Sequence, residues 1–395
     1  SPKTMIFGLG QSMGGINKRG RIYNCWCTDE FSHTEEKTSL YGAHNFMIFY
    51  EPDSKNAFGL FFDYPGLVQI DAAFSSFDTV SVKIEDVHLN MYYIEGNSLL
   101  NVAGQFRKMI GASYVPPVWS LGFMQSRWGY GSEEDLKRVY KNYKEKNIPL
   151  DAIFLDIDYM EGFRDFSINK KNFSDFAKTV SDFKEKNVHI VPIIDAGIKV
   201  EDAAPDSEGV QNDYFCKKAD GSLFAAGVWP GLSHFTDFLN PAARRWFGGL
   251  YKKLTDMGID GFWNDMNDPA LFYSEDGLKN AYKEILSVID NKNPEVYDTW
   301  KLKDAVLGVQ NSMDDYKSFY HKVPADIAGG LAEDVQGGVA VVQHSKVHNL
   351  YGYNMTRAAS EFFTKNCKND VLIFSRASYI GAHRYGGIWT GDNAS

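Results

Sequence analysis

Two apolar stretches of the sequence run directly into carboxylates. The run 259–264 leads into Asp265, and the run 387–390 leads, after one glycine, into Asp392. Strand ends are where parallel α/β folds place their catalytic groups. Two carboxylates on one face can cleave a glycosidic bond, because one attacks the sugar carbon while the other protonates the leaving oxygen. The nucleophile must be ionised and the acid protonated, and we expect burial against rings such as Trp389 to keep the acid protonated.

A repeated strand–loop–helix pattern after a stiff linker at 113–117 would position these carboxylates. The strands are continuous apolar runs, as in a parallel sheet that is buried on both faces. The sequence predicts strands at 119–125, 150–155, 188–194, 259–264, 371–374 and 387–390, and helices at 133–146, 174–186, 241–257 and 277–289. This pattern predicts an α/β fold, a (β/α)8 TIM barrel whose strand ends meet on one face. Six strands would leave open edges, so we expect the barrel to be truncated after its sixth strand.

The first part of the chain has a different pattern. Short apolar runs at 45–50, 57–63, 79–84 and 88–94 are separated by Asp, Gly, Pro and Ser, and a helical period covers 98–110. We therefore predict an antiparallel β-sandwich domain at 1–112 and the incomplete barrel domain at 113–395. The polar run 14–38 is predicted to be a loop that reaches elsewhere.

Two long segments, near 199–235 and 273–344, interrupt the barrel pattern and are predicted to be insertions. The second contains a low-complexity part at 324–338 with few core-forming residues. We expect that part to be a mobile surface insert.

Composition narrows the class of partner. The 395 residues are 44% hydrophobic and 15% aromatic, and carry a net charge of −10. A large core is therefore possible, the charge disfavours nucleic acid and anionic membranes, and rings suit the apolar faces of sugars. The sequence contains no apolar run long enough to span a membrane. Four cysteines, predicted to be reduced thiols of a cytoplasmic protein, lack the partner ligands of a zinc site: Cys25, Cys27, Cys216 and Cys367.

Several motifs resemble glycoside hydrolase family 31, the α-glucosidase and α-xylosidase family. They are WNDMN at 263–267, FSR at 374–376, WTGDN at 389–393 and DIDYM at 156–160, and the resemblance runs from about Phe7 to the last residue. It implies that Asp265 is the nucleophile and Asp392 the acid/base, with no metal or cofactor. The substrate contacts that it implies are Asp29, Trp128, Asp156, Ile157, Trp229, Trp263, Met266, Arg376 and Trp389.

The implied activity is that of a retaining, exo-acting α-glycosidase that releases α-linked glucose from the non-reducing end of oligosaccharides. Two alternatives stay open: an α-xylosidase of the same family, and a non-catalytic, degenerate barrel that only binds carbohydrate. A homo-oligomer is also compatible with the sequence.

The sequence departs from the family at Asp268, where the family usually has Glu. The shorter side chain would have to remake the contacts of the Glu, directly or through water. A substrate-binding His of the family is absent, and we expect structural roles for His344, His348 and His383.

Overall fold

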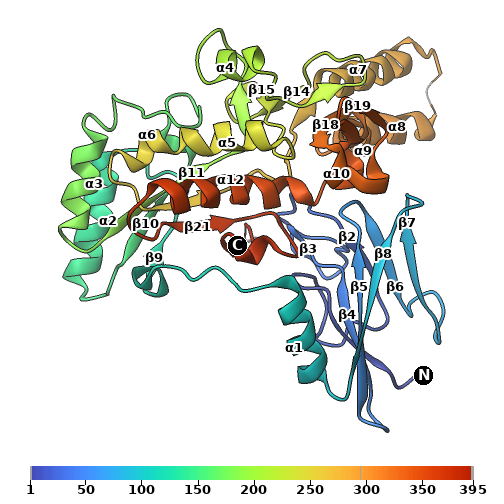
Figure 1. The fold of residues 1–395 in the computed structure, drawn as a ribbon. Helices are drawn as coiled ribbons and strands as arrows, with labels where there is room; N and C mark the ends of the chain where they lie inside the picture. The colour runs from blue at the N-terminus through green and yellow to red at the C-terminus, as the bar shows by residue number, and fades with distance from the viewer. Residues whose placement is uncertain (1, 294, 393–395) are drawn as a thin grey trace.

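The structure, a computed structural model, describes residues 2–293 and 295–392. Figure 1 shows a β-rich N-terminal region beside a larger α/β region, with α1 (Leu99–Ile110) near the crossing from one to the other. Ser98 caps α1 by accepting a hydrogen bond from the backbone N–H of Asn101, as a polar residue before an apolar helical period should.

The α/β region is built on a six-stranded parallel sheet in the order β23-β21-β16-β11-β10-β9. Adjacent strands in the sheet follow one another along the chain, as in a (β/α) barrel, and within the described residues β9 and β23 are its two edges. The bounds are β9 (Met124–Gln125), β10 (Ala152–Leu155), β11 (His189–Ile194), β16 (Gly261–Asn264), β21 (Leu372–Ser375) and β23 (Gly387–Ile388).

All six predicted strands are present, but the first is much shorter than predicted. The 3₁₀ helix η1 (Val118–Leu121) occupies its start, and the Ser120 hydroxyl closes that turn by donating to the Pro117 carbonyl at 2.7 Å. A local side-chain hydrogen bond has replaced the start of the strand there.

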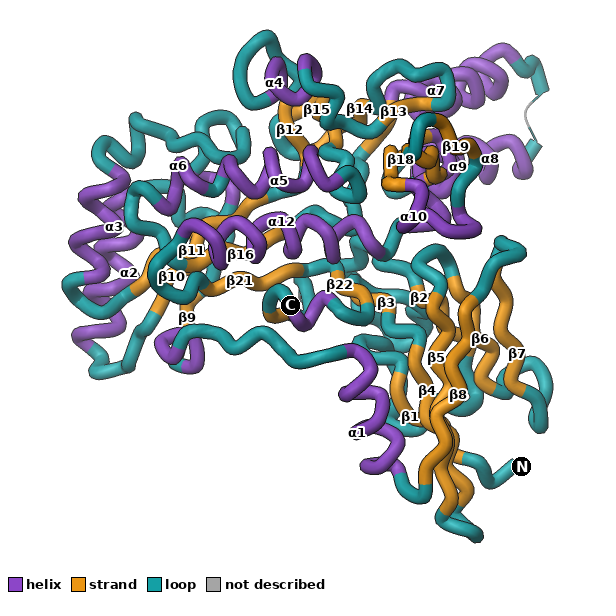
Figure 2. Tube along the Cα trace, viewed as in Figure 1, coloured by secondary structure: helices purple, strands orange, loops and turns teal. Residues whose placement is uncertain are grey.

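Helices line the outer side of this sheet, and α5 and α12 run along each other (Figure 2). Ser132 caps α2, as predicted. The predicted helix 241–257 is divided at Tyr251 into two helices. The bounds are α2 (Glu133–Glu145), α3 (Phe176–Lys184), α5 (Pro241–Leu250), α6 (Lys252–Thr255) and α12 (Leu350–Asn366), with the 3₁₀ turns η2 (Ile157–Tyr159) and η4 (Ala382–Arg384).

The N-terminal region contains two antiparallel sheets, ordered β1-β4-β5-β8 and β2-β6-β7, whose buried faces share one hydrophobic cluster. The bounds are β1 (Met5–Gly8), β2 (Ile22–Cys25), β4 (Phe46–Glu51), β5 (Asn56–Asp63), β6 (Val68–Ala72), β7 (Val80–Ile84) and β8 (Asn90–Gly96). The prediction that 14–38 is all loop was wrong for β2, because Tyr23 and Cys25 point into the core while the strand pairs with β6.

The two insertions share their sheets, because one strand of each insertion pairs within the sheet of the other. The bounds in the first are β12 (Gly197–Lys199), α4 (Asp206–Gln211), β13 (Lys217–Lys218), β14 (Ala225–Val228) and β15 (Gly231–Phe235). Those in the second are β17 (Tyr273–Ser274), α7 (Glu275–Asp290), α8 (Val296–Leu307), α9 (Met313–Ser318), β18 (Phe319–Pro324), β20 (Val339–Gln343) and α11 (His344–Val347). β17 joins the sheet of the first insertion beside β14, and β13 joins that of the second beside β18.

The segment 324–338, expected to be a mobile surface insert, lies mostly at the surface and contains regular secondary structure. It forms α10 (Ala325–Ala328), η3 (Gly329–Leu331) and β19 (Asp334–Gln336), and β19 pairs with β20. Ala328 is buried in a small cluster with Val323 and Ala340. A few small apolar side chains are enough here because neighbouring strands supply the rest of the core.

A short parallel pair between β3 (Gly42–Ala43) and β22 (Ser378–Tyr379) joins the N-terminal region to the carboxyl side of the barrel sheet. Across the described ranges, no helix combines the length and apolar character needed to cross a membrane.

Candidate active site

The strand register brings Asp265 and Arg376 to the same edge of the sheet. Asn264, the last residue of β16, lies opposite Ser375, the last residue of β21. The Arg376 backbone N–H then donates to the Asn264 carbonyl at 3.0 Å, and the Asp265 N–H donates to the Ile194 carbonyl at 2.9 Å. The backbone N–H of each residue is therefore hydrogen-bonded to a neighbouring strand at the carboxyl end of the parallel sheet.

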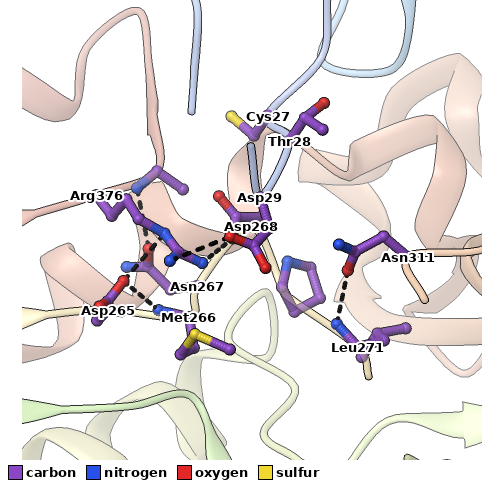
Figure 3. A network of polar contacts seen from close by, with 12 residues as sticks. Cys27, Thr28, Asp29, Asp265, Met266, Asn267, Asp268, Leu271, Asn311 and Arg376 are labelled. Carbon is purple, nitrogen blue, oxygen red and sulfur yellow. Dashed lines mark hydrogen bonds and ion pairs between the residues drawn. The ribbon is translucent and has the colours of Figure 1, made fainter. Parts of the chain in front are cut away.

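Arg376 is almost completely buried and meets three carboxylates (Figure 3). Its Nη2 donates to Asp268 Oδ2 at 2.5 Å, and its Nη1 lies 3.4 Å from Asp29 Oδ1. Its Nε lies 3.0 Å from Asp265 Oδ1, but the N–H is not aligned with that oxygen, so this contact is an ion pair rather than a hydrogen bond. The Tyr41 ring lies 5.0 Å from the guanidinium carbon and covers it.

Asp268 stands where the family usually has the longer Glu. Its carboxylate reaches Arg376 directly, although its second oxygen, Oδ1, is buried without a partner. The Asp268 side chain is completely buried.

Three negative groups around one positive group leave an excess of negative charge in a buried site. Burial raises the pKa of Asp265 to about 7, and the charges of Asp392 and Asp268 act in the same direction. The Arg376 guanidinium and the Met266 N–H, which donates to Asp265 Oδ1 at 2.7 Å, act against this rise. Arg376 itself stays charged, because the carboxylates raise its pKa well above the usual value despite its burial.

Asp156 follows β10 at the same edge. Burial raises the pKa of Asp156 to about 6, and the charges of Asp158 and Asp392 add to this rise. The Ile157 N–H, which donates to Asp156 at 2.7 Å, acts against the rise. Asp29 is affected in the same way: burial raises its pKa, Arg376 acts against this, and Asp268 and Asp392 add to it. Asp392 thus acts electrostatically on Asp29, Asp156 and Asp265.

Asp392 is exposed, which corrects the expectation that it is buried against Trp389. It is the last residue that the structure describes, and Asn393 of the WTGDN motif lies outside the described residues. The Trp389 ring instead packs edge-on against Trp263, with ring centroids 5.5 Å apart.

The two tryptophans border a cavity of about 240 Å³ on the inner side of the sheet, together with Phe154 and Phe374. Trp263 is fixed there because its Nε1 donates to the Leu155 carbonyl at 3.1 Å.

The remaining candidate residues differ in burial and in what they contact. Met266 is buried beside Asp265 in the left-handed region, with φ 52°. Ile157 is a core residue of the α/β region. Trp229 is partly exposed and packs edge-on against Phe272, and Trp128 is exposed.

Asp195 was passed over as a site residue although the strand-end signal that marked Asp265 marks it too. It follows β11, it is buried, and both of its carboxylate oxygens lack a partner. Burial raises its pKa well above the usual range, and the charges of Asp165, Asp265 and Asp156 add to this rise.

One group of metal-type ligands lies in the insertions. The ligand atoms of Cys216, Asp237 and His321 lie within 4.8 Å of one another. They already contact one another, since His321 Nδ1 lies 2.8 Å from Asp237 Oδ1 and 3.6 Å from Cys216 Sγ.

Comparison with known proteins places the chain in a family. Residues 113–395 match the model of the glycosyl hydrolases family 31 TIM-barrel domain, and residues 1–71 match that of the glycosyl hydrolase 31 N-terminal galactose mutarotase-like domain. The chain is 31% identical over 394 residues to alpha-glucosidase 2 of Bacillus thermoamyloliquefaciens, covering 99% of the chain and 43% of that protein. It is 30% identical over 405 residues to alpha-xylosidase 1 of Arabidopsis thaliana, covering 98% of the chain and 42% of that protein.

Solved structures agree in fold. The family 31 alpha-glucosidase of Bacteroides thetaiotaomicron superposes with a TM-score of 0.75 at 26% identity, over 99% of the chain and 56% of that structure. The GH31 dextranase of Flavobacterium johnsoniae, complexed with glucose, gives a TM-score of 0.77 at 23% identity, over 99% of the chain and 41% of that structure.

A parallel sheet with carboxylates at the carboxyl ends of its strands is the arrangement in which (β/α)-barrel enzymes carry their catalytic groups. The chain belongs to glycoside hydrolase family 31. It spans less than half of the two curated relatives named above.

Proposed function

We propose that the protein containing this chain is a retaining, exo-acting α-glycosidase that releases α-linked glucose from the non-reducing end of oligosaccharides. The observation that carries the proposal is Asp265 itself. It is a buried carboxylate at a strand end, paired with the charged Arg376, and a second carboxyl group, Asp392, lies close enough to influence its pKa.

In the first step, an oxygen of Asp265 attacks the anomeric carbon, and the bond from that carbon to the leaving oxygen breaks. Asp392 gives its proton to the leaving oxygen, and a β-glycosyl ester with Asp265 forms. In the second step, Asp392 takes a proton from a water molecule whose oxygen attacks the same carbon. Asp265 leaves as a carboxylate, and the sugar is released in the α configuration.

The other candidate residues would hold the sugar. Asp29, Asp156 and Arg376 offer charged partners for hydroxyl groups, which form strong hydrogen bonds in a dry site. Aromatic side chains suit the apolar faces of the ring. In this proposal the pocket walls are Trp128, Ile157, Trp229, Trp263, Met266 and Trp389.

An α-xylosidase is the second candidate, because one relative at 30% identity carries that name. The two activities differ in whether the site accepts the hydroxymethyl group at C5 of glucose. A purely sugar-binding protein is disfavoured, since a binder needs neither Asp265 nor Asp392.

A substrate panel separates these candidates. The complete protein is assayed with aryl α-glucoside, α-xyloside and α-galactoside, and the anomer first released is followed by NMR. We expect fastest turnover of the α-glucoside with initial release of the α anomer, and no activity above background in Asp265→Ala. Undiminished activity in that variant would overturn the assignment.

A further inference from the structure

The strands of the two insertions bring a sulfur, a carboxylate and an imidazole together at a place that the proposed reaction does not use. Antiparallel pairing of β13 with β18 sets Lys217 opposite Tyr320 (Figure 2). One step further along the two chains, Cys216 comes opposite His321. Asp237 follows β15, whose last carbonyl accepts from the Cys216 N–H at 2.9 Å. Three segments that are far apart in the sequence therefore place one metal-type ligand each at the same point.

The sulfur and the carboxylate converge on one nitrogen. His321 Nδ1 lies 3.6 Å from Cys216 Sγ and 2.8 Å from Asp237 Oδ1, and the three ligand atoms lie within 4.8 Å of one another. A nucleophilic Cys–His–Asp arrangement would instead need the sulfur at one ring nitrogen and the carboxylate at the other. Convergence on a single nitrogen is the arrangement expected of ligands around a common centre.

This set of ligand atoms suits zinc. Zinc in proteins binds sulfur at about 2.3 Å and nitrogen or oxygen at about 2.0–2.2 Å, so the ligand atoms of a tetrahedral site lie about 3.3–3.7 Å apart. The Cys216–His321 spacing of 3.6 Å fits this range, and the Asp237 oxygen would move away from the ring by about 0.5 Å. One thiolate and one carboxylate offset the two positive charges of the ion, which lowers the cost of burying them. Magnesium and calcium are disfavoured, because they prefer oxygen ligands alone.

Hydrogen bonds around the three residues already fix their orientation, as the outer partners of metal ligands do. On the side of the ring away from the cluster, His321 Nε2 lies 2.9 Å from His344 Nδ1. The second oxygen of Asp237, Oδ2, accepts from the Lys322 N–H at 2.7 Å. Cys216, Asp237 and His321 are each at most 2% exposed. The ligands would therefore need little reorganisation to hold an ion.

A cavity gives an ion access to this cluster. Its volume is about 460 Å³, and Asp237 and His321 belong to its lining. Lys217 and Lys322 line it too, but both are paired with the Asp213 carboxylate, which weakens their repulsion of a cation. Water from the cavity can supply the fourth ligand that three protein groups leave open.

We propose that Cys216, Asp237 and His321 bind one zinc ion together with a water molecule, and that the ion ties the first insertion to the second. On binding, the thiol proton passes to solvent, and the sulfur, oxygen and Nδ1 atoms each bond to the ion. The expectation that the cysteines lack the partners of a zinc site took account only of spacing along the chain. Cys216 and His321 are 105 residues apart, so no local motif marks them. The proposal does not depend on the glycosidase reaction.

Metal analysis of the complete protein tests the site. The protein is dialysed against zinc and then against metal-free buffer, and its zinc content is measured by inductively coupled plasma mass spectrometry. We expect about one zinc ion per chain, and less than about one-tenth of that in Cys216→Ala. Cys367→Ala, which removes a half-buried thiol outside the cluster, is the control and should keep its zinc. Equal zinc contents in the wild-type and Cys216→Ala proteins would overturn the proposal.

Cobalt spectroscopy decides the matter even if Cys216→Ala folds poorly. With Co²⁺ in place of zinc, the wild-type protein should show a thiolate-to-cobalt charge-transfer band and the visible bands of a tetrahedral ion. The same bands should appear in Asp265→Ala, so the metal site is decided whether or not the protein cleaves any sugar. A wild-type protein without the thiolate band would overturn the proposal, because the three side chains would then only hydrogen-bond one another.

Unfolding tests the link between the insertions. Removing the ion with a chelator should lower the thermal unfolding midpoint of the wild-type protein by about 5 °C, because an ion that binds only the folded state stabilises it. Added zinc should restore the midpoint, and Cys216→Ala should respond to neither treatment. A wild-type midpoint that does not respond to the chelator would overturn the structural role of the ion.

Discussion

Arg376 is the residue on which the site depends most. One guanidinium serves three carboxylates that come from the β16 end, the turn after it and the N-terminal region. Its charge lowers the cost of ionising Asp265, but one positive charge cannot offset three negative ones. Burial, with the excess negative charge adding to it, therefore raises the pKa of Asp265 to about 7, well above the ordinary value of a carboxyl group.

This balance of charges around Asp265 predicts how the pH dependence of activity changes in Asp268→Asn. Asp265 attacks only when it is ionised, so activity should fall as the pH drops through its pKa of about 7. Removing the negative charge of Asp268 makes ionisation of Asp265 easier, and we expect the acid limb of kcat/KM to move to lower pH.

Asp158→Asn is the matched control. Asp158 acts on Asp156, whereas the main groups that shift the pKa of Asp265 are Arg376, the Met266 N–H, Asp392 and Asp268, so loss of the Asp158 charge should leave that limb in place. An acid limb that moves upward in Asp268→Asn would contradict the electrostatic account.

At the scale of elements, α12 fixes the turn that follows β16. Gly352 packs its bare Cα against this turn, and a Cβ there would lie 2.7 Å from the Asn267 carbonyl oxygen and 2.8 Å from Ala377 Cβ. Asn267 in turn accepts from the Ala377 N–H at 3.0 Å. The helix can approach the site this closely only because residue 352 has no side chain.

Gly352→Ala should therefore destabilise the protein by about 1–3 kcal/mol, because it overpacks rigid backbone. Gly104→Ala, in the exposed middle of α1 with open space around it, should stabilise by about 0.5–1 kcal/mol. Denaturant unfolding of both variants measures the contrast. A stabilised Gly352→Ala protein would contradict the close approach of α12.

Some elements could be predicted from the sequence because their signal is local. The barrel strands were predicted from continuous apolar runs. The helix α2 was predicted from its N-cap residue Ser132 and from its amphipathic period. The helix α12 was missed although Tyr351, Met355 and Phe363 recur on one face; it lies between the second predicted insertion, which ends at 344, and the strand predicted at 371–374. The strand β2 was missed because its four residues lie within a longer polar run, and its pairing with β6 decides the fold there.

At the scale of the whole molecule, the site is shared between two regions of different architecture. The N-terminal region contributes Asp29, and Asn349 at the start of α12 fixes the strand that leads to it. The Asn349 side chain accepts from the Cys27 N–H and donates to the carbonyls of Cys25 and Gly66. The motifs indicated that Asp29 reaches the substrate, but they carried no sign of its contact with Arg376, because that contact exists only once both regions have folded.

Asn349→Ala should loosen this junction. It leaves buried backbone groups unpaired, and we expect a loss of about 1–3 kcal/mol in the free energy of unfolding together with a raised KM. Asn366→Ala, which removes an exposed side chain at the far end of the same helix, is the control and should change neither quantity appreciably. An unchanged KM in Asn349→Ala would contradict the role of the junction in presenting Asp29.

The central claim is that Asp265 forms a covalent bond to the sugar, and one measurement tests it directly. The complete protein is incubated with a fluorinated glucosyl fluoride, whose ring fluorine slows hydrolysis of the glycosyl ester, and is then digested and analysed by mass spectrometry. The account predicts one added fluoroglucosyl group per active site, on the peptide that contains Asp265, and none in Asp265→Ala. A label on another carboxylate, or turnover with no label on Asp265, would contradict it.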